Sequence, residues 1–588
     1  MKKVIRLFGK EFNISRFNKI AEAISRFSFA EKIIFGVFSV IFVLSALLIM
    51  LKVNEQFLIK VPKVGGTLHE GVIGTPRFIN PLLAISETDR DLTTLIYSGL
   101  TRTTPTGDVI PDLAYSYEVT EDGLEYIFKI RDDAVFHDGE KVTADDIVFT
   151  IEKAKDPVIK SPKRANWEGV LVEKLSDNEV RFVLSQPYSP FLLNTTLGIL
   201  PKHIWENVSP EEFAFTQINI EPIGSGPYEL SKVKRNSSGI AEKYELKAFD
   251  KFTLSKPYIK NIYFSFFKNE DILVNALKSN QINSINSIQP ARASELELSG
   301  HNVKQFPLPR IFGVFLNQSK SPILVSKAVR SALDEAINKE ALVGKVLSNY
   351  GNVANGPIPE SIIPFSQLSS PDESASETTV SDEAHIAAAK LILEEAGFEL
   401  NEQGVMQRET SDGVEILSFS ISTPNVPELT LAAESVIESW KKIGADVTLK
   451  VFEPNDFNQN VIRPRNYDAI LFGEIIGRDL DFFAFWHSSQ RNDPGLNIAD
   501  YANIDVDSAL EEARQLDNGP ERVEKLRVFV QEIQKDMPAI FLYSPNFIYV
   551  VPERLQGVVP KNIATPSERF LSVYNWYLET DTVWRIFN

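Results

Sequence analysis

Nineteen consecutive uncharged residues near the N-terminus, Ile33 to Leu51, constrain this chain more than any other feature of its sequence. As a helix rising about 1.5 Å per residue, the stretch reaches roughly 28 Å, which matches a bilayer hydrocarbon core of about 30 Å. A soluble helix of this length normally shows a polar stripe, and a cleaved signal peptide has a shorter apolar region followed by small residues. Because the segment LIMLKVNEQF offers no cleavage site, we predict an uncleaved transmembrane anchor at 33–51.

The charged residues around this segment indicate its orientation. Residues 1–32 hold eight Lys and Arg against three Glu, and the positive-inside bias therefore places them in the cytoplasm. We predict a basic cytoplasmic tail at 1–32, the anchor at 33–51 and a short stalk at 52–63. Everything after the stalk is then expected outside the cytoplasm, with the protein held to the cell membrane by a single pass.

The large part beyond the stalk is acidic and lacks cysteine. The whole chain has a net charge of −18, and the +7 of residues 1–63 leaves −25 for the rest. This balance argues against nucleic acid as a partner, because phosphate contacts need Lys and Arg. The absence of cysteine from all 588 residues excludes disulfides, thiolate metal sites and a lipid-modified cysteine anchor.

Mixed α/β patterns begin at Gly65. The stretch YSYEVTEDGLEYIFKI at 115–130 alternates apolar and polar residues on both sides of a DG turn, which predicts a β-hairpin. The stretch TADDIVFTIEKAKDP predicts a helix with Thr143 as its N-cap. Segment 366–383 is polar and acidic without aromatic residues, so we predict a disordered surface loop there.

Motifs for metal binding, phosphate binding and nucleophilic catalysis are missing. The six histidines lack paired metal spacing, and no GxxxxGK[ST] or GxSxG motif occurs. His137, in FHDGE, is expected to be structural. Asp479 and Asp481, in YDAILFGEIIGRDLDFFAFWHSSQ (467–490), would suit a membrane-tethered hydrolase, but no base, nucleophile or oxyanion element accompanies them. We therefore predict no metal, no cofactor and no enzymatic activity.

Several stretches beyond the stalk occur in an order that points to one protein family. The longest is IPDLAYSYEVTEDGLEYIFKIRDDAVFHDGEKVTADDIVFTIEKAKDP at 110–157. The others are, in order, ILPKHIWE, IGSGPYEL, VFLNQSKSPILVSKAVRSALDEAINKEALV, NGPIPESI, AKLILEEAGF, YDAILFG, NIADYANIDVDSAL and MPAIFLYSPNFIYVV. Over about residues 65–585, the chain resembles the family 5 extracellular solute-binding proteins, the dipeptide and oligopeptide receptors of ABC importers.

The resemblance implies an α/β fold of two lobes, a hinged receptor of the periplasmic-binding-protein type (type II, cluster C), preceded here by one transmembrane helix. Lobe I is expected at 64–268 and 541–588, and lobe II at 269–540. The chain would cross the hinge near 264–268 and return near 541–545. Ligand contacts to both lobes would shift the population toward a closed form, which docks on a membrane permease.

The resemblance also implies where the ligand lies. In peptide-binding members of the family, the ligand backbone pairs as an added strand with one extended segment from each lobe. These segments match Ile85, Ser86 and Glu87 in lobe I, and Gly473, Glu474, Ile475 and Ile476 in lobe II.

The family's aspartate that anchors the ligand's α-amino group is displaced in this chain. A gapless match puts Gly477 at its position, so Asp479 is the nearest carboxylate. Glu474, which replaces the family's usual tryptophan, could do the same work. Asp479 could equally cap a turn or pair with Arg478. Trp486 is a candidate pocket wall or a core residue.

Other polar residues match the family without a settled role. Tyr501 is a candidate ligand contact, although the N…Y-x-N run that it forms with Asn497 and Asn503 mainly braces the lobe in the family. A ligand carboxylate could be received by Arg463, Arg478 or Arg491, and the sequence does not choose among them.

The implied function is an extracytoplasmic substrate-binding receptor that captures peptides between two closing lobes. Its expected partners are the peptide, the permease subunits with an ATPase behind them, and the membrane, and the receptor is expected to be a monomer. Two alternatives stay open. One is another solute, such as a metal chelate, a sugar or an opine-like compound. The other is a ligand-sensing receptor acting through a partner, because a 32-residue tail is too short for a catalytic module.

Overall fold

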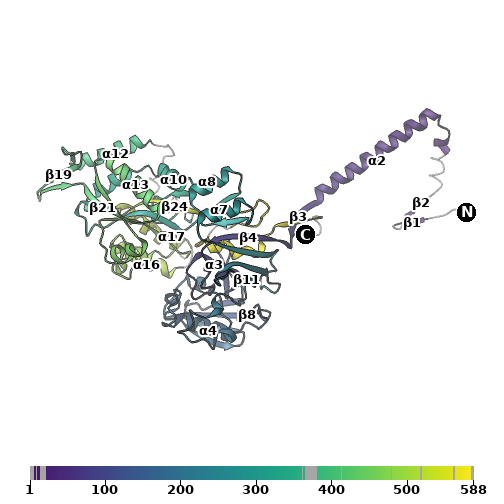
Figure 1. Ribbon diagram of the computed structural model, residues 1–588, viewed down its shortest axis with the longest axis horizontal. Helices are drawn as coiled ribbons and strands as arrows, with labels where there is room; N and C mark the ends of the chain where they lie inside the picture. The colour runs from purple at the N-terminus through teal and green to yellow at the C-terminus, as the bar shows by residue number, and fades with distance from the viewer. Residues whose placement is uncertain are drawn as a thin grey trace. The chain divides into compact units, whose positions relative to one another are not determined.

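A computed structural model of this chain describes residues 5–7, 10–12, 22–360, 362–363, 368, 381–411, 413–478, 480–516, 519–559 and 563–584. Most of the loop predicted at 366–383 lies outside the described residues, and so does Asp479. The chain divides into two compact units, one made of 1–63 with 579–588 and one made of 64–578. Figure 1 labels many of the elements of both units.

The smaller unit contains one long apolar helix, α2 (Phe29–Phe57). This helix includes the whole predicted anchor at 33–51, and its portion Phe29–Asn54 is long and apolar enough to cross a membrane. Its large apolar side chains are exposed rather than packed into a protein core, as expected of side chains that meet lipid. Two short strands, β1 (Ile5–Leu7) and β2 (Lys10–Phe12), pair antiparallel ahead of it.

The stalk and the end of the chain form a two-stranded ribbon in the same unit. α2 continues directly into β3 (Leu58–Lys63), which pairs antiparallel with β25 (Glu579–Trp584). The rings of Phe57 and Trp584 stack with their centroids 6.4 Å apart. The last strand therefore returns to the segment that leaves the apolar helix, although the sequence placed 541–588 with lobe I.

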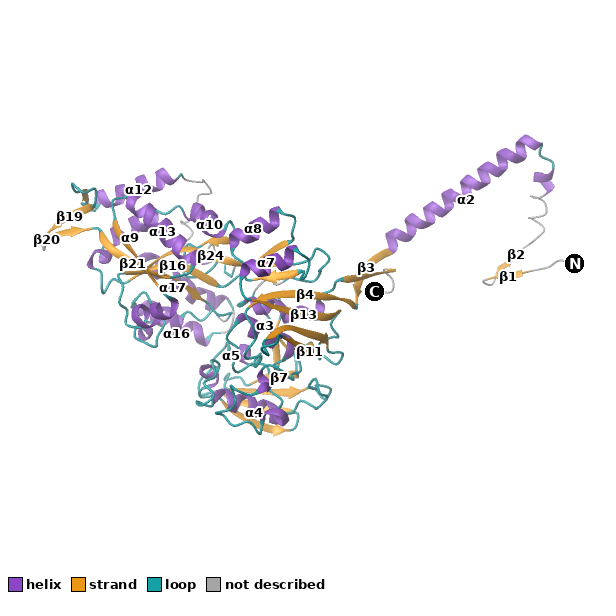
Figure 2. Cartoon of the chain, in the orientation of Figure 1, coloured by secondary structure: helices purple, strands orange, loops and turns teal. Residues whose placement is uncertain are grey.

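The larger unit is built around one twelve-stranded sheet (Figure 2). Its strands lie in the order β11-β12-β13-β4-β14-β24-β16-β23-β21-β22, and β15 and β17 also pair with β24. The strands are β4 (Gly65–Ile73), β11 (Tyr228–Arg235), β12 (Ala241–Ala248), β13 (Ile259–Phe267), β14 (Ser284–Asn286), β15 (Val303–Pro307), β16 (Arg310–Leu316), β17 (Gly351–Val353), β21 (Ser418–Pro424), β22 (Asp446–Phe452), β23 (Ala469–Ile475) and β24 (Ala539–Val550).

Strand β24 joins the two halves of this sheet, a first half that holds β4 and a second half that holds β16. Its first half pairs with β16, from Ala539 to Tyr543, and its second half pairs with β15, from Asn546 to Val550. The predicted return across the hinge at 541–545 falls in the middle of this strand. The half of the sheet that holds β4 also takes in β14 and β15, so it extends to Pro307, whereas lobe I was expected to end at residue 268.

A second, four-stranded sheet, β7-β8-β10-β9, belongs to the first half of the unit. Its strands are β7 (Ala114–Val119), β8 (Glu125–Ile130), β9 (Leu171–Ser176) and β10 (Glu179–Val183). The antiparallel pair β7–β8 confirms the predicted hairpin. Helix α4 (Ala144–Lys155) lies against this sheet (Figure 2), and the Asp146 carboxylate accepts the Thr143 backbone N–H at 2.8 Å, which confirms the predicted helix start.

The helices of the larger unit surround these sheets and divide its apolar residues into several cores. The main ones are α3 (Glu87–Ile96), α7 (Glu270–Lys278), α8 (Pro290–Leu298), α9 (Lys327–Glu335), α10 (Lys339–Leu347), α12 (Asp382–Glu395), α13 (Pro427–Lys442), α16 (Ile504–Gln515), α17 (Pro520–Asp536) and the 3-10 segment η6 (Pro566–Asn575). One large core holds Trp167 and Trp576, and separate cores around β16, β23 and β24 hold Trp440 and Trp486. The first half of β24 packs into different cores from its second half, as expected of a strand shared by two lobes.

Candidate functional site

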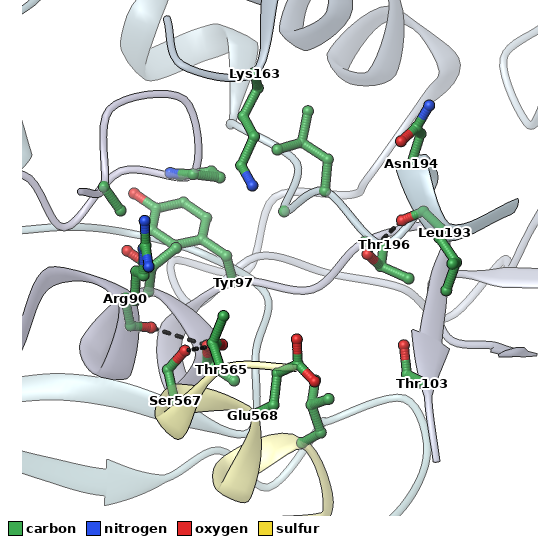
Figure 3. A pocket seen from close by; sticks show the side chains of 18 of the residues that line it. Arg90, Tyr97, Thr103, Lys163, Leu193, Asn194, Thr196, Thr565, Ser567 and Glu568 are labelled. Atoms are coloured by element: carbon green, nitrogen blue, oxygen red, sulfur yellow. Dashed lines mark hydrogen bonds between the residues drawn. The ribbon is translucent and has the colours of Figure 1, made fainter. Parts of the chain in front are cut away.

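A cavity of about 470 Å³ opens beside α3, where the two halves of the larger unit meet (Figure 3). Most of its wall comes from the first half, and Ile475, at the end of β23, comes from the second. The remaining wall is contributed by the start of η6. Its polar lining residues include Arg90, Thr93, Tyr97, Lys163, Asn166, Asn194, Thr565, Ser567 and Glu568. This volume lies within the range of about 300–1,000 Å³ typical of small-ligand sites.

Two buried hydroxyl groups in this wall lack a partner. Tyr97 is only 3% exposed, and neither its hydroxyl nor the Thr93 Oγ1 has a hydrogen-bond partner within the described residues. Burial raises the pKa of Tyr97, so its hydroxyl stays protonated and is available as a donor. A Cβ at Gly198 would lie 2.7 Å from the Tyr97 Cβ, so this glycine makes room for the tyrosine. Unpaired buried hydroxyls in a cavity wall are candidate ligand contacts.

Charged side chains of both signs line the cavity. Arg90 projects from α3, and Lys163 comes from the loop before Trp167 (Figure 3). Desolvation in the cavity lowers the pKa of Lys163, and the neighbouring Arg90 lowers it further, against the opposing charge of Glu568. These charged side chains can bind a charged or polar ligand in the cavity.

Glu568 is already engaged by the second half of the unit. Arg478, three residues after β23, forms an ion pair with the Glu568 carboxylate at the start of η6. The backbone N–H of Ala564 donates to the same carboxylate oxygen at 2.8 Å. The Arg478 side chain is 9% exposed, and its Nη1 has no hydrogen-bond partner in the described part of the chain. This ion pair joins the two lobes at the edge of the cavity.

The predicted lobe I segment borders the cavity. Ala84 lines it, and Ile85 directly after it has 62% of its surface exposed. Ser86 is the N-cap of α3: its hydroxyl accepts the Asp89 backbone N–H at 3.1 Å. Glu87 accepts a hydrogen bond from the Ser287 hydroxyl at 2.5 Å. The segment therefore presents one exposed apolar side chain beside a capped helix start.

The predicted lobe II segment forms the end of β23. On one side, residues 472–475 pair with 310–313 of β16, whereas β21 pairs with β23 only at Ala469 and Ile470. Within the described residues no strand covers the other edge of 472–475. Ile475 is 56% exposed and lines the cavity, while the backbone N–H of Ile476 donates to the Pro309 carbonyl at 2.8 Å. An uncovered strand edge of this kind is a template for an added strand.

Gly473 is packed closely in this segment. It lies opposite Phe312 in the register, and a Cβ at this position would approach the Phe312 ring to 2.4 Å. The glycine therefore lets the phenylalanine ring lie directly against β23. No larger residue fits here unless that ring moves.

Glu474 and Trp486 lie inside lobe II, away from the cavity. Glu474 is 1% exposed, and the Trp486 Nε1–H donates to its Oε2 at 3.1 Å. Burial raises the pKa of Glu474 to about 8, so the carboxyl group is neutral at neutral pH. Trp486 is fully buried against Phe315 and Phe541. Strand alternation explains the placement, because Glu474 and the cavity-facing Ile475 point to opposite faces.

The remaining predicted residues that the structure describes form contacts within lobe II. Asp479 lies outside the described residues. Asp481 forms an ion pair with Arg514 at 3.0 Å, so this carboxylate is neutralised within lobe II. The Tyr501 hydroxyl donates to Asp536 at 2.6 Å, which braces the loop before α16. Arg463 and Arg491 lie near Asp493 and Asp500, at 3.8 and 2.7 Å, and neither arginine lines the cavity.

His137 has the structural role that the sequence predicted. Its Nε2 lies 3.1 Å from the Gly226 carbonyl, and its Nδ1 accepts the Gly224 backbone N–H at 3.3 Å. Burial lowers the pKa of His137 to about 4, so the ring is neutral and ties two loops together.

Of the residues that line the cavity, sequence reasoning identified only Ile475; those it missed include Arg90, Tyr97, Lys163 and Glu568. Arg90 is on a helix where an exposed arginine is unremarkable, and Lys163 is one of many surface lysines. Glu568 is more than 400 residues from both along the chain. No local pattern links residues that only the fold brings together.

Two lobes that share one sheet, with a polar cavity between them, define the class of hinged solute-binding receptors of the periplasmic-binding-protein type. Residues 108–494 match the model of the bacterial extracellular solute-binding proteins, family 5 (middle). The chain belongs to this family, as its sequence motifs implied.

Known relatives share most of their length with this chain. The oligopeptide-binding protein AppA of Bacillus subtilis is 29% identical over 525 residues, which is 88% of this chain and 92% of that protein. The structure of B. subtilis AppA in complex with a nonapeptide has a TM-score of 0.65 at 27% identity, covering 88% of this chain and all of that one. NikZ of Campylobacter jejuni, in complex with Ni(L-His), also gives a TM-score of 0.65 at 28% identity, covering 87% and 99%.

Proposed function

We propose that this protein is the substrate-binding receptor of an ABC importer, and that it captures peptides between its two lobes. The observation that carries the proposal is the uncovered edge of β23 at 472–475, which ends at the cavity with Ile475 in its wall. A peptide backbone adds to such an edge through main-chain hydrogen bonds, which do not depend on its sequence. The likeness to AppA, whose structure holds a nonapeptide, supports the same ligand class.

The Arg478–Glu568 ion pair fits this function. It lies between the loop after β23 and η6, at the rim of the cavity that a ligand would occupy. Contacts that span both lobes stabilise the closed form, and a ligand held between the lobes adds to them. The receptor then binds and releases its ligand unchanged, without enzymatic turnover.

The apolar helix α2 adds a membrane anchor to this receptor. With residues 1–32 in the cytoplasm and 64–578 outside, the anchor keeps a monomeric receptor at the membrane that contains its permease. Tethering raises the effective concentration of the receptor at the permease. It also replaces the lipid-modified cysteine that a chain without cysteine cannot carry.

A metal chelate is the second candidate ligand, favoured by the likeness to NikZ with its bound Ni(L-His). No group of three or more His, Asp or Glu side chains placed to hold a metal ion occurs among the described residues. A metal would therefore have to arrive already chelated, as it does in that relative's complex.

Native mass spectrometry of the full chain, purified in detergent, tests the ligand class directly. We expect a copurified peptide, and thermal stabilisation when a peptide library is added to the emptied receptor. Stabilisation by Ni(L-His) with no response to any peptide would overturn the peptide assignment. Hydrolysis of the bound peptides would overturn the receptor assignment.

A further inference from the structure

The cavity carries two cations that form no ion pair with any described side chain. Arg90 and Lys163 both line it, and neither side chain has an ion-pair or hydrogen-bond partner among the described residues. The other charged lining residues are paired: Arg102 with Asp112 at 2.7 Å, and Glu568 with Arg478. The unneutralised charge of the cavity is therefore positive.

A third cation lies close to Arg90. Arg310 begins β16, opposite the cavity-lining Ile475 in the register. Burial lowers the pKa of Arg310 and the charge of Arg90 lowers it further, against the opposing charges of Glu87 and Glu428. Its Nε is buried without a hydrogen-bond partner in the described residues. The charges of Arg90 and Arg310 repel each other, which raises the free energy of the empty cavity, and a bound anion relieves that repulsion.

The neutral polar groups of the same wall also favour a ligand group that accepts hydrogen bonds. The Tyr97 hydroxyl and the Thr93 Oγ1 are buried and unpaired, and each can donate one hydrogen bond. Figure 3 shows the Tyr97 hydroxyl on the same side of the cavity as Arg90 and Lys163. Two cations and two hydroxyl donors around one space match the oxygens of a carboxylate better than they match an apolar or cationic group.

We propose that this cavity selects ligands with a carboxylate, which Arg90 and Lys163 bind with help from Tyr97. The proposal rests on the proposed function and makes it more specific: among peptides, the receptor prefers those that place an anionic group in the lobe I cavity. That group is either an acidic side chain or the C-terminal carboxylate.

Six peptides distinguish the two sources. The probes are AAEAA, AAQAA and AAKAA, each with a free or an amidated C-terminus, titrated calorimetrically into the full chain in detergent. If the cavity takes a side chain, AAEAA binds about tenfold tighter than AAQAA in both series, and AAKAA binds weakest. If it takes the C-terminus, amidation costs about tenfold whatever the central residue.

Some outcomes overturn the proposal. Equal affinity for all six peptides would contradict carboxylate selection and leave the peptide receptor standing. No binding of any of the six, with ligand found only among non-peptide solutes, would instead overturn the proposed function, and the carboxylate preference for peptides with it.

Substitutions then assign the effect to these residues. Arg90→Gln and Lys163→Gln should each weaken binding of the preferred carboxylate peptide by about tenfold and change its neutral counterpart by less than about twofold. Arg164→Gln is the matched control, because Arg164 neighbours Lys163 but does not line the cavity and pairs with Glu168 at 3.8 Å.

A charge-reversal variant distinguishes loss of the proposed contact from misfolding. If the cavity takes a side chain, Lys163→Glu should lower affinity for AAEAA and raise affinity for AAKAA above the wild-type value. If it takes the C-terminus, the variant should bind the amidated peptides more tightly than their free counterparts. A damaged protein cannot gain this affinity. An unchanged order of preference in Lys163→Glu would show that Lys163 does not face the ligand's charged group, and would overturn the proposal.

Discussion

Arg478 and Glu568 form an ion pair across the two lobes although 90 residues separate them in the sequence. Arg478 follows the strand whose free edge ends at the cavity, and Glu568 lies in the wall of the same cavity. Both side chains are largely shielded from solvent, so the pair is less screened than an ordinary surface salt bridge. The two residues therefore link the position of the lobes to the site where the ligand is proposed to bind.

Breaking this pair should weaken ligand binding by favouring the open form. Arg478→Gln is expected to weaken binding of a neutral peptide such as amidated AAQAA by about three- to tenfold, since about 1 kcal/mol of closed-form stability is lost. Calorimetric titration measures the affinity, and small-angle scattering measures the shift toward an open form. Arg463→Gln is the control, because Arg463 is exposed and its nearest carboxylate, Asp493, lies in the same lobe at 3.8 Å. Equal losses in both variants would contradict the interlobe role.

The buried carboxyl group of Glu474 should make the stability of the protein depend on pH. Its pKa is about 8 in the folded protein, against 4.5 without burial, so the folded state holds a proton that the unfolded state has lost between these values. The free energy of unfolding should therefore fall as pH rises from about 5 through 8. Glu474→Gln keeps an acceptor for the Trp486 Nε1–H and has no proton to lose.

Chemical denaturation of wild type and Glu474→Gln at pH 5, 6.5 and 8 measures this difference. Between pH 5 and 8, the free energy of unfolding of the wild type should fall more than that of the variant. The difference is on the order of 1.4 kcal/mol per pH unit while Glu474 is protonated in the folded protein and ionised in the unfolded one. Parallel curves for the two proteins would show that Glu474 ionises normally. Glu118→Gln, a substitution of an exposed glutamate on β7 that lies 3.7 Å from Lys129, is the control.

Much of the fold could be predicted because its signals are local. The hairpin at 115–130 follows from alternation around a DG turn, and the helix after Thr143 follows from its cap. The family motifs run in sequence order and imply two lobes. The extent of the lobe I sheet could not be predicted from local signals, because β14 spans only three residues and its place beside β4 depends on long-range pairing.

The site could be predicted only in part. The sequence proposed the segment 473–476 as a ligand contact, but only Ile475 of this segment lines the cavity, because the face on which each side chain lies depends on strand register. That register turns Glu474 into the core and leaves Ile475 at the cavity. The cations of the cavity come from a helix and a loop whose sequences are typical of exposed segments, so no sequence pattern identifies Arg90 or Lys163 as site residues. Unpaired charge becomes visible only when the neighbours of each side chain are known.

A buried ion cluster that links η6 to α3 and β4 should be essential to the stability of lobe I. Arg569 is fully buried and donates to Asp91 on α3 at 2.7 and 2.8 Å and to Glu70 on β4 at 2.9 Å. Burial raises the pKa of Asp91 to about 6, against the opposing effect of Arg569. Arg569→Met should destabilise the protein by about 3–5 kcal/mol, because it leaves two buried acids without their cation.

Thermal unfolding of the full chain checks this loss, and lower pH provides the internal control. Protonation of Asp91 removes one unpaired charge, so Arg569→Met should regain part of its stability as pH falls from 7 to 5. An equal deficit at both pH values would contradict the account of unpaired acids. Arg554→Met changes an arginine outside this cluster and should leave stability within about 0.5 kcal/mol of the wild type.

The topology proposed for the anchor can be tested because the chain contains no cysteine, so each introduced cysteine is the only thiol. Ser25→Cys lies in the tail predicted to be cytoplasmic, and Ser238→Cys lies in the exposed turn between β11 and β12. Neither position is buried, so both should react in detergent. A membrane-impermeant maleimide added to intact cells should label Ser238→Cys and leave Ser25→Cys unlabelled until the cells are opened. Labelling of Ser25→Cys in intact cells would contradict the proposed orientation. Recovery of the Ser238→Cys protein in the soluble fraction, shortened by the length of the apolar helix, would show that the helix is cleaved instead of serving as an anchor.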